Sequence, residues 1–280
     1  MDTVAVIGVG AMGTALVRGL EAAGWQKLDL RLADARVERV GELGAEGHLA
    51  WTDPTIAAES ARVVVVAVKP DVVADVLAEL APVLGPGHVI VSIAAGVRIA
   101  TIEAHLPGVP VVRAMPNTPA LVGAGITGYA AGSAASEDDV AAAAAVLSAL
   151  GETVPVDEAD LDAVTAVSGS GPAYVFLLTE ALEEAARAEG LDPGAAAALA
   201  RQTVVGAGSL LAADTAKPEE LRRRVTSPGG TTEAALRSFE QDGFRRIVRS
   251  AVHAARTRSE ELGAAAGAGE GAEASPMADG

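Results

Sequence analysis

The chain has 280 residues, of which half are hydrophobic and 2% aromatic, and its formal net charge at pH 7 is -16. This length predicts two domains with cores of aliphatic side chains, and the acidic balance argues against a nucleic-acid backbone or an anionic membrane as partner. The lack of cysteine excludes disulfides and thiolate chemistry. Because the four histidines are scattered, no metal site is expected.

A strand, a glycine-rich turn and a helix open the chain. A β-branched run at residues 4–7 meets GxGxxG and then an amphipathic pattern at 14–20. This order is typical of a dinucleotide site, since the glycines allow a tight turn, a close pyrophosphate and close helix packing. The alternative is a tight turn without a ligand. The predicted cofactor contacts here are Ile7, Gly8, Val9, Gly10, Ala11, Met12 and Gly13.

A second predicted strand, residues 28–33, ends at two residues with opposite implications for the cofactor. Asp34 is placed to accept from a ribose 2′-hydroxyl and so favours NAD. Arg36 is placed to pair with a 2′-phosphate and so favours NADP, unless its side chain extends into solvent. The residues themselves leave this preference open.

A continuous apolar run at residues 63–68 predicts a central parallel strand buried on both faces. It ends at Lys69-Pro70, on the edge where cofactors bind in open α/β sheets. Val68, Lys69 and Pro70 are therefore predicted cofactor contacts, although Lys69 alone is equally consistent with a solvated strand end.

Two further strands end in residues suited to the same edge. Residues 89–93 lead to Ala94-Ala95-Gly96, whose small side chains leave room for a nicotinamide or ribose, so Ala95 is a predicted cofactor contact. The alternative is that these small residues serve close packing alone. Residues 109–114 lead to a loop held rigid by two prolines, where Asn117 offers a donor and an acceptor. The alternation of strands and helices then closes near residue 156.

From Glu158 onward the pattern is helical. The long helices are apolar on most faces, which predicts burial, either against a second copy or within a monomer core. The sequence shows no basic or cleavable start and no unbroken apolar stretch of about 18 residues, so a cytoplasmic protein without a membrane span is expected. The predicted domains are residues 1–157, residues 158–262 and a disordered Ala/Gly/Glu-rich tail at residues 263–280.

Within the helical region, a Ser-Pro-Gly-Gly-Thr-Thr turn precedes a predicted helix. The turn leaves backbone N–H groups free beside two hydroxyls and the positive end of a helix dipole, which together suit a carboxylate. The alternative is an ordinary loop with a threonine N-cap. The residues concerned are Ser227, Gly229, Gly230, Thr231 and Thr232.

Three long motifs in order carry a resemblance that covers the chain from Val4 to about Leu262. They are VRAMPNTP at residues 112–119, DAVTAVSGSGPAY at 162–174 and VTSPGGTT at 225–232. On these motifs the chain closely resembles the pyrroline-5-carboxylate reductase family. The resemblance implies an α/β fold with an N-terminal Rossmann-like doubly wound sheet and an all-α C-terminal dimerisation domain. It also implies an interlocked homodimer, or a higher homo-oligomer, with substrate bound between the domains.

The resemblance also implies roles for individual residues. The loop from Ser227 to Thr232 would hold the substrate carboxylate, with Thr232 near the ring nitrogen, and Glu158 matches an acidic substrate-side position. The implied cofactor is NADPH, or NADH. One departure concerns the adenosine ribose, where the family often has asparagine and this chain has Pro54, which puts that contact in doubt.

The implied activity is hydride transfer from NAD(P)H to 1-pyrroline-5-carboxylate, the last step of proline synthesis. One alternative is a 3-hydroxyacid dehydrogenase or another cyclic-imine reductase. Against the former, the helical region has a single lysine, Lys217, in an exposed-looking turn. An alternative of another class is a regulatory protein that binds nucleotide without turnover.

Overall fold

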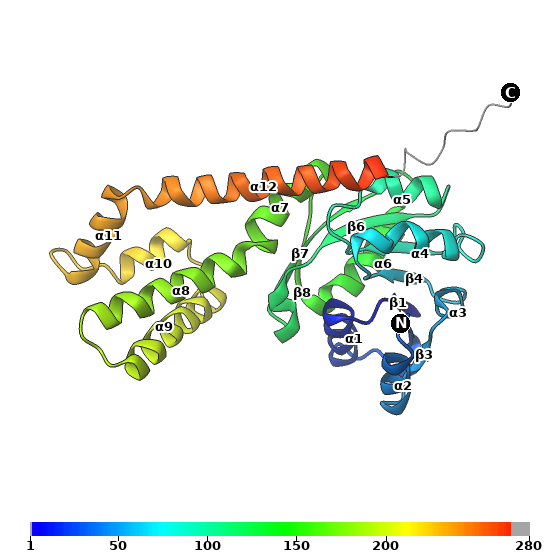
Figure 1. Cartoon of the computed structure of the whole chain (residues 1–280), viewed down its shortest axis with the longest axis horizontal. Helices are drawn as coiled ribbons and strands as arrows, with labels where there is room; N and C mark the ends of the chain where they lie inside the picture. The colour runs from blue at the N-terminus through cyan, green and yellow to red at the C-terminus, as the bar shows by residue number, and fades with distance from the viewer. Residues whose placement is uncertain (1, 270–280) are drawn as a thin grey trace, which may run out of the picture. The chain divides into compact units, whose positions relative to one another are not determined.

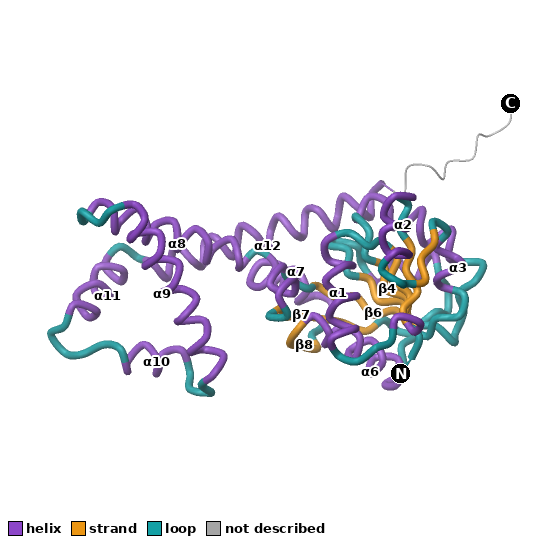
Figure 2. Tube along the Cα trace, turned by 90° about the horizontal axis from the view of Figure 1, so that it is seen from below, coloured by secondary structure: helices purple, strands orange, loops and turns teal. Residues whose placement is uncertain are grey.

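The computed structural model describes residues 2–269, which form two compact units. Unit 1 contains residues 2–169 and 255–269, and unit 2 contains residues 170–254. Strands occur in unit 1, whereas the described residues of unit 2 form helices and loops (Figure 2). The chain therefore leaves unit 1 after Gly169 and returns to it at Ala255.

Unit 1 is built on an eight-stranded sheet in the order β3-β2-β1-β4-β5-β6-β7-β8. Neighbouring strands are parallel except for β6 and β7, which pair antiparallel. The strands are β1 Val4–Ile7, β2 Leu30–Ala33, β3 Leu49–Trp51, β4 Val63–Val66, β5 Val89–Ser92, β6 Val111–Met115, β7 Gly125–Ala131 and β8 Gly151–Pro155.

Helices cover both faces of this sheet (Figure 1). Their bounds are α1 Ala11–Ala22, α2 Val37–Ala45, α3 Pro54–Ala58, α4 Val73–Leu80, α5 Ile99–His105, α6 Glu137–Leu147 and α7 Leu161–Val164. Side chains of α1, α2 and α6 share one core with alternate strand residues, and side chains of α3, α4 and α5 share the other. The doubly wound prediction is confirmed.

The valine run of β4 illustrates why these residues form a central strand. All four residues are fully buried, with alternate side chains in opposite cores. A strand covered on both faces needs apolar side chains at every position rather than at every second one. Full burial of each such side chain contributes roughly 1.5–3 kcal/mol.

Unit 2 contains α8 Gly171–Ala188, α9 Pro193–Ala213, α10 Pro218–Arg224 and α11 Thr231–Gln241, and α12 Phe244–Gly269 runs from unit 2 into unit 1. Within the single chain, large apolar side chains of this unit lie exposed, among them Phe176 at 63% and Leu177 at 65%. Two helical runs, Glu158–Ala188 and Pro193–Ala213, are long and apolar enough to cross a membrane by length and composition. Both runs contain charged residues, so neither is an unbroken apolar stretch, and a helix covered by another protein surface has the same composition.

The unit boundaries differ from the predicted domain boundaries at both ends of the helical region. Residues 158–169 belong to unit 1, because α7 and the π-helical turn Thr165–Gly169 pack on the sheet. At the other end, α12 continues to Gly269, so the tail predicted from residue 263 begins as helix. Alanine is the strongest helix former, and the alanines after Gly263 extend the helix. Residues 270–280 of the predicted tail lie outside the described residues.

Candidate active site

The turn between β1 and α1 has the geometry that a bound pyrophosphate requires. Gly8 has φ +94°, and a Cβ there would lie 2.8 Å from Val68 Cγ1, while a Cβ on Gly13 would lie 2.2 Å from the Gly8 oxygen. Both positions therefore need glycine for the fold itself. In contrast, a Cβ on Gly10, the N-cap of α1, would meet no protein atom within 4 Å. Open space over a backbone at a helix N-terminus suits a phosphate.

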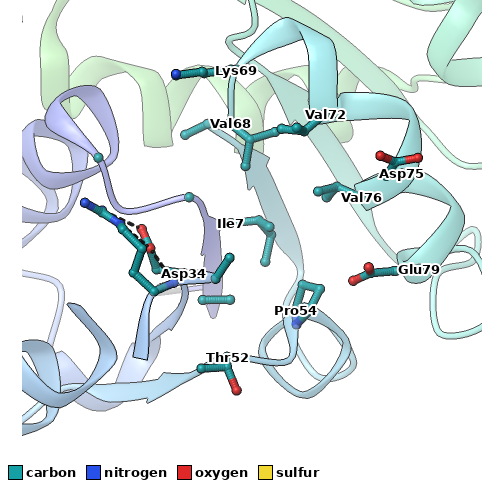
Figure 3. Close-up of a pocket in the computed structure, with 16 residues that line it drawn as sticks. Ile7, Asp34, Thr52, Pro54, Val68, Lys69, Val72, Asp75, Val76 and Glu79 are labelled. Atoms are coloured by element: carbon teal, nitrogen blue, oxygen red, sulfur yellow. Dashed lines mark hydrogen bonds and ion pairs between the residues drawn. The ribbon is translucent and has the colours of Figure 1, made fainter. Parts of the chain in front are cut away.

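A cavity of about 540 Å³ lies beside this turn (Figure 3). It brings together seven predicted cofactor contacts from β1, the ends of β2 and β4 and the residues that follow them: Ile7, Gly8, Gly10, Asp34, Arg36, Val68 and Lys69. Pro54, the departure from the family pattern, also lines it, as do Thr52 and the α4 residues Val76 and Glu79. The cavity thus lies at the carboxyl ends of parallel strands, where cofactors bind in this fold.

Asp34 and Arg36 form an ion pair at one side of the cavity. Arg36 Nε donates to Asp34 Oδ1 at 2.8 Å and Arg36 Nη2 donates to Oδ2 at 3.0 Å, while the Val9 N–H donates to Oδ2 at 3.0 Å. Burial alone would raise the pKa of Asp34, but the hydrogen bonds from Arg36 and Val9 outweigh it, so the pKa lies below its usual value. Both carboxylate oxygens are thus engaged, whereas the Arg36 side chain is 62% exposed.

The remaining predicted cofactor contacts do not line the cavity. Val9, Ala11, Met12 and Gly13 lie in the turn and the first part of α1, Pro70 opens a short 3-10 turn, and Ala95 follows β5. Asn117 is buried, and its amide joins two parts of unit 1. Its Nδ2 donates to the Ser168 oxygen at 3.2 Å and its Oδ1 accepts from the Ile126 N–H at 3.0 Å. These contacts give Asn117 a structural role.

Glu158 lies in the segment after β8 and bonds to two other parts of unit 1. Its Oε1 accepts from the Ile99 N–H at 2.7 Å, at the N-terminus of α5, and from Arg113 Nη1 at 3.1 Å. Arg113 is buried, so Glu158 neutralises a cation that would otherwise be costly to bury. The Glu158 side chain remains 29% exposed.

The Ser-Pro-Gly-Gly-Thr-Thr turn lies in unit 2 and leads into α11. Gly229 has φ +72°, Gly230 is the N-cap, and Thr231 is the first helical residue, so the structure has a glycine cap rather than a threonine cap. The Gly230 N–H donates to the Ser227 oxygen at 3.0 Å, and the Gly229 N–H donates to Glu233 Oε2 at 2.9 Å. The N–H groups of the first helical turn have no intrahelical partner, as at any helix start. The turn therefore presents backbone donors, one of which already holds a carboxylate.

Comparisons with known proteins agree with this arrangement. The family described as pyrroline-5-carboxylate reductase dimerisation matches residues 158–262, and the family described as NADP oxidoreductase coenzyme F420-dependent matches residues 3–96. The chain is 44% identical to pyrroline-5-carboxylate reductase of Pseudomonas aeruginosa, over 92% of this chain and 96% of that protein. The chain belongs to the pyrroline-5-carboxylate reductase family.

Solved structures of this family resemble the chain closely. The pyrroline-5-carboxylate reductase of Coxiella burnetii superposes with a TM-score of 0.90 at 36% identity, covering 93% of this chain and 98% of that one. The pyrroline carboxylate reductase of Plasmodium falciparum, solved with NADP bound, has a TM-score of 0.79 at 30% identity, covering 94% and 98%. The α/β fold with a helical C-terminal region is therefore that of the pyrroline-5-carboxylate reductases.

Sequence reasoning missed a residue that supports the turn between β1 and α1, called the phosphate turn below. Arg39 on α2 donates from Nε to the Val9 oxygen at 3.2 Å and from Nη2 to Thr14 Oγ1 at 3.1 Å. Its side chain is largely buried, and its third nitrogen pairs with Glu42 at 2.9 Å. The available signal was its place one helical turn after Arg36. Among the described residues, no group of three or more His, Cys, Asp or Glu side chains is placed to hold a metal ion.

Proposed function

We propose that the chain reduces 1-pyrroline-5-carboxylate to L-proline with NADPH, the last step of proline biosynthesis. The observation that carries the proposal is the 44% identity to a pyrroline-5-carboxylate reductase over nearly the whole of both chains. The glycine-rich turn between β1 and α1 and the cavity at the strand ends independently support binding of the nucleotide cofactor. A single exposed lysine in the helical region, Lys217 at the N-cap of α10, argues against 3-hydroxyacid dehydrogenase chemistry.

The residues of unit 1 fit the cofactor. The α1 N-terminus and the uncovered backbone at Gly10 would hold the pyrophosphate, and the exposed guanidinium of Arg36 would meet a 2′-phosphate. Because Arg36 and Val9 occupy the oxygens of Asp34, that carboxylate is less available to a ribose 2′-hydroxyl, which favours NADPH over NADH. The bound nicotinamide supplies a hydride. The proposal also includes the other predicted cofactor contacts, which lie between Ile7 and Gly13 and at Val68, Lys69, Pro70, Ala95 and Asn117.

The residues of unit 2 that belong to the substrate half are Ser227, Gly229, Gly230, Thr231 and Thr232. Backbone donors at the start of α11 would bind the substrate carboxylate, and the Thr232 hydroxyl would hydrogen-bond the ring nitrogen. The carbon of the C=N bond, which becomes C5 of proline, accepts the hydride, and one proton ends on nitrogen. A threonine hydroxyl is a poor acid, so Thr232 orients the nitrogen, and the proton comes with an iminium substrate or through water.

Glu158 has a second role in the proposal besides its structural one. Both of its hydrogen bonds within the chain use Oε1. A substrate-side contact would therefore fall to Oε2.

The partner in the proposal is a second copy of the chain. The dimerisation family covers residues 158–262, and exposed apolar side chains such as Phe176, Leu177 and Leu210 lie within that range. Burial of these side chains against an identical surface would stabilise a homodimer with interlocked helical regions, or a higher homo-oligomer. The proposed location is the cytoplasm.

The test follows NADPH absorbance with 1-pyrroline-5-carboxylate as substrate and L-proline as the identified product. Thr232→Ala is expected to lower kcat about 10- to 1000-fold, or about 1.4–4 kcal/mol of barrier. Ser238→Ala, which removes an exposed hydroxyl from the same helix, is the matched control and is expected to behave like the wild type. Nucleotide binding without turnover would instead support the regulatory alternative, and unchanged kinetics in Thr232→Ala would remove Thr232 from the mechanism.

A further inference from the structure

The last turns of α12, which belong to unit 1, make a buried polar contact with α7. Ser259 Oγ donates to Asp162 Oδ1 at 2.7 Å, across a sequence separation of 97 residues. Ser259 is 8% exposed and Asp162 is 6% exposed, so both groups have lost most of their water. A buried hydrogen bond to a charged group is costly to break, because the carboxylate is left without its partner.

A second contact, one turn further along α12, joins backbone to backbone. A Cβ on Gly263 would lie 3.3 Å from the Gly96 oxygen, and a Cβ on Gly96 would lie 3.5 Å from Gly263 Cα. Gly96 has φ +79°, a conformation that favours glycine. The end of α12 therefore packs directly on the loop of residues 94–98, which leads from β5 to α5 (Figure 1).

Arg98 connects the two contacts. Its Nη2 lies 3.9 Å from Asp162 Oδ2 and 3.8 Å from the position that a Cβ on Gly263 would take. The next residue, Ile99, donates its N–H to Glu158. Two carboxylates of one short segment, Glu158 and Asp162, thus hold the end of the loop, and α12 holds the second carboxylate.

The loop lies at the cofactor edge of the sheet. The Ile93 N–H donates to the Val66 oxygen at 3.1 Å, so the residues that follow β5 start beside the end of β4, whose continuation through Val68 and Lys69 lines the cavity. In a Rossmann-like sheet, the side of β1 opposite the adenosine-binding β2 receives the nicotinamide half of the cofactor. Ala95 is the predicted cofactor contact in this loop.

We propose that Ser259 is a positioning residue: through Asp162, and with Gly263 packed on Gly96, it fixes the loop of residues 94–98 on the nicotinamide side. This inference rests on the proposed cofactor assignment. The final turns of α12 then belong functionally to the nucleotide site, although the rest of the helix belongs to the helical unit.

The first experiment compares Ser259→Ala with Thr257→Ala, which removes an exposed hydroxyl from the same helix. Hydrogen exchange in peptides covering residues 94–98 is expected to accelerate in Ser259→Ala alone, with exchange in residues 4–13 unchanged. The value of kcat/KM for NADPH is expected to fall about 10-fold. A displacement of reacting groups by about 1 Å can lower the rate by up to about 100-fold, and a smaller displacement is expected here. The isotope effect with NADPH deuterated at the transferred position is expected to rise, and Ser259→Thr is expected to restore all three measurements.

A second variant separates positioning from helix stability. Gly263→Ala raises the helix propensity of α12, because alanine is a stronger helix former than glycine, so weakening of the helix cannot explain any loss of activity. Its Cβ is expected to displace the loop at Gly96 and to lower kcat/KM while the melting temperature stays level or rises. Unchanged exchange at residues 94–98 and unchanged kinetics in both variants would overturn the proposal. If the wild-type protein does not reduce the imine, the exchange measurement and NADPH affinity still test the loop, so the two failures are distinguishable.

Discussion

Alanine substitutions at two glycines of the phosphate turn are expected to separate cofactor binding from folding. At Gly13 the added Cβ would lie 2.2 Å from the Gly8 oxygen, a backbone atom that cannot move without shifting β1 or α1. Overpacking typically costs 1–3 kcal/mol, and this contact is expected to cost about 3 kcal/mol. At about 2–4 °C per kcal/mol, the melting temperature of Gly13→Ala should fall by roughly 6–12 °C.

At Gly10 the added Cβ would meet no protein atom within 4 Å. Alanine is a poorer N-cap than glycine, which limits the stability loss to about 1 kcal/mol or less. The methyl group would instead occupy the space through which a pyrophosphate approaches, so NADPH affinity should fall about 10- to 100-fold, or about 1.4–2.8 kcal/mol.

The assay is thermal unfolding by circular dichroism, together with NADPH titration followed by nucleotide fluorescence. Gly41→Ala is the matched control, because a Cβ there also meets open space but lies on α2, away from the cavity. Wild-type NADPH affinity in Gly10→Ala, or wild-type stability in Gly13→Ala, would refute the reasoning.

Three further outcomes follow from the contacts described above. Arg36→Met should lower the ratio of kcat/KM for NADPH to that for NADH about 10- to 100-fold, because it removes the exposed cation and frees Asp34; the exposed Arg18→Met is the control, and an unchanged ratio would exclude Arg36 from 2′-phosphate recognition. The lowered pKa of Asp34 means that its contribution to the free energy of unfolding is present above its unfolded pKa of about 3.9 and is lost as pH falls through the folded pKa. The difference in unfolding free energy in urea between the wild type and Asp34→Asn should therefore be present at pH 6 and begin to shrink as pH falls below about 4, and a constant difference would contradict the assignment. Phe176→Asp should convert the proposed dimer to a monomer in light scattering, whereas Val122→Asp, also at an exposed apolar side chain but in unit 1, should not; a dimeric Phe176→Asp would place the interface elsewhere.

The sheet could be predicted from the sequence because its signals are local. The valines of β4 are apolar at every position, and both core faces of the sheet use them. The glycine turn and the residue positions at the strand ends were likewise encoded within a few residues of each other. Four residues predicted from these signals, Ile7, Gly8, Asp34 and Lys69, line one cavity in the structure.

Some contacts give individual residues roles that the sequence did not predict, and no local sequence pattern encodes these contacts. The sequence placed Asp34 and Arg36 at the same sheet edge and predicted opposite cofactor preferences from them. In the structure the two side chains form an ion pair. Glu158 was assigned from the family resemblance, and its bonds to Ile99 and Arg113 span 59 and 45 residues. Ser259 carried one usable signal, because it and Gly263 are small residues spaced to share one face of α12.

The return of α12 to unit 1 affects how the protein is made. Ribosomes add about 5–20 residues per second, and a nascent domain can complete only the contacts whose residues have been synthesised. Ser259 follows Asp162 by 97 residues. At that rate, Ser259 is synthesised about 5–20 s after Asp162, and their hydrogen bond cannot form earlier. The nucleotide-binding unit is therefore finished after the helical insertion has been translated, and premature stops before Ser259 are expected to release chains whose sheet unit is cleaved faster by proteases.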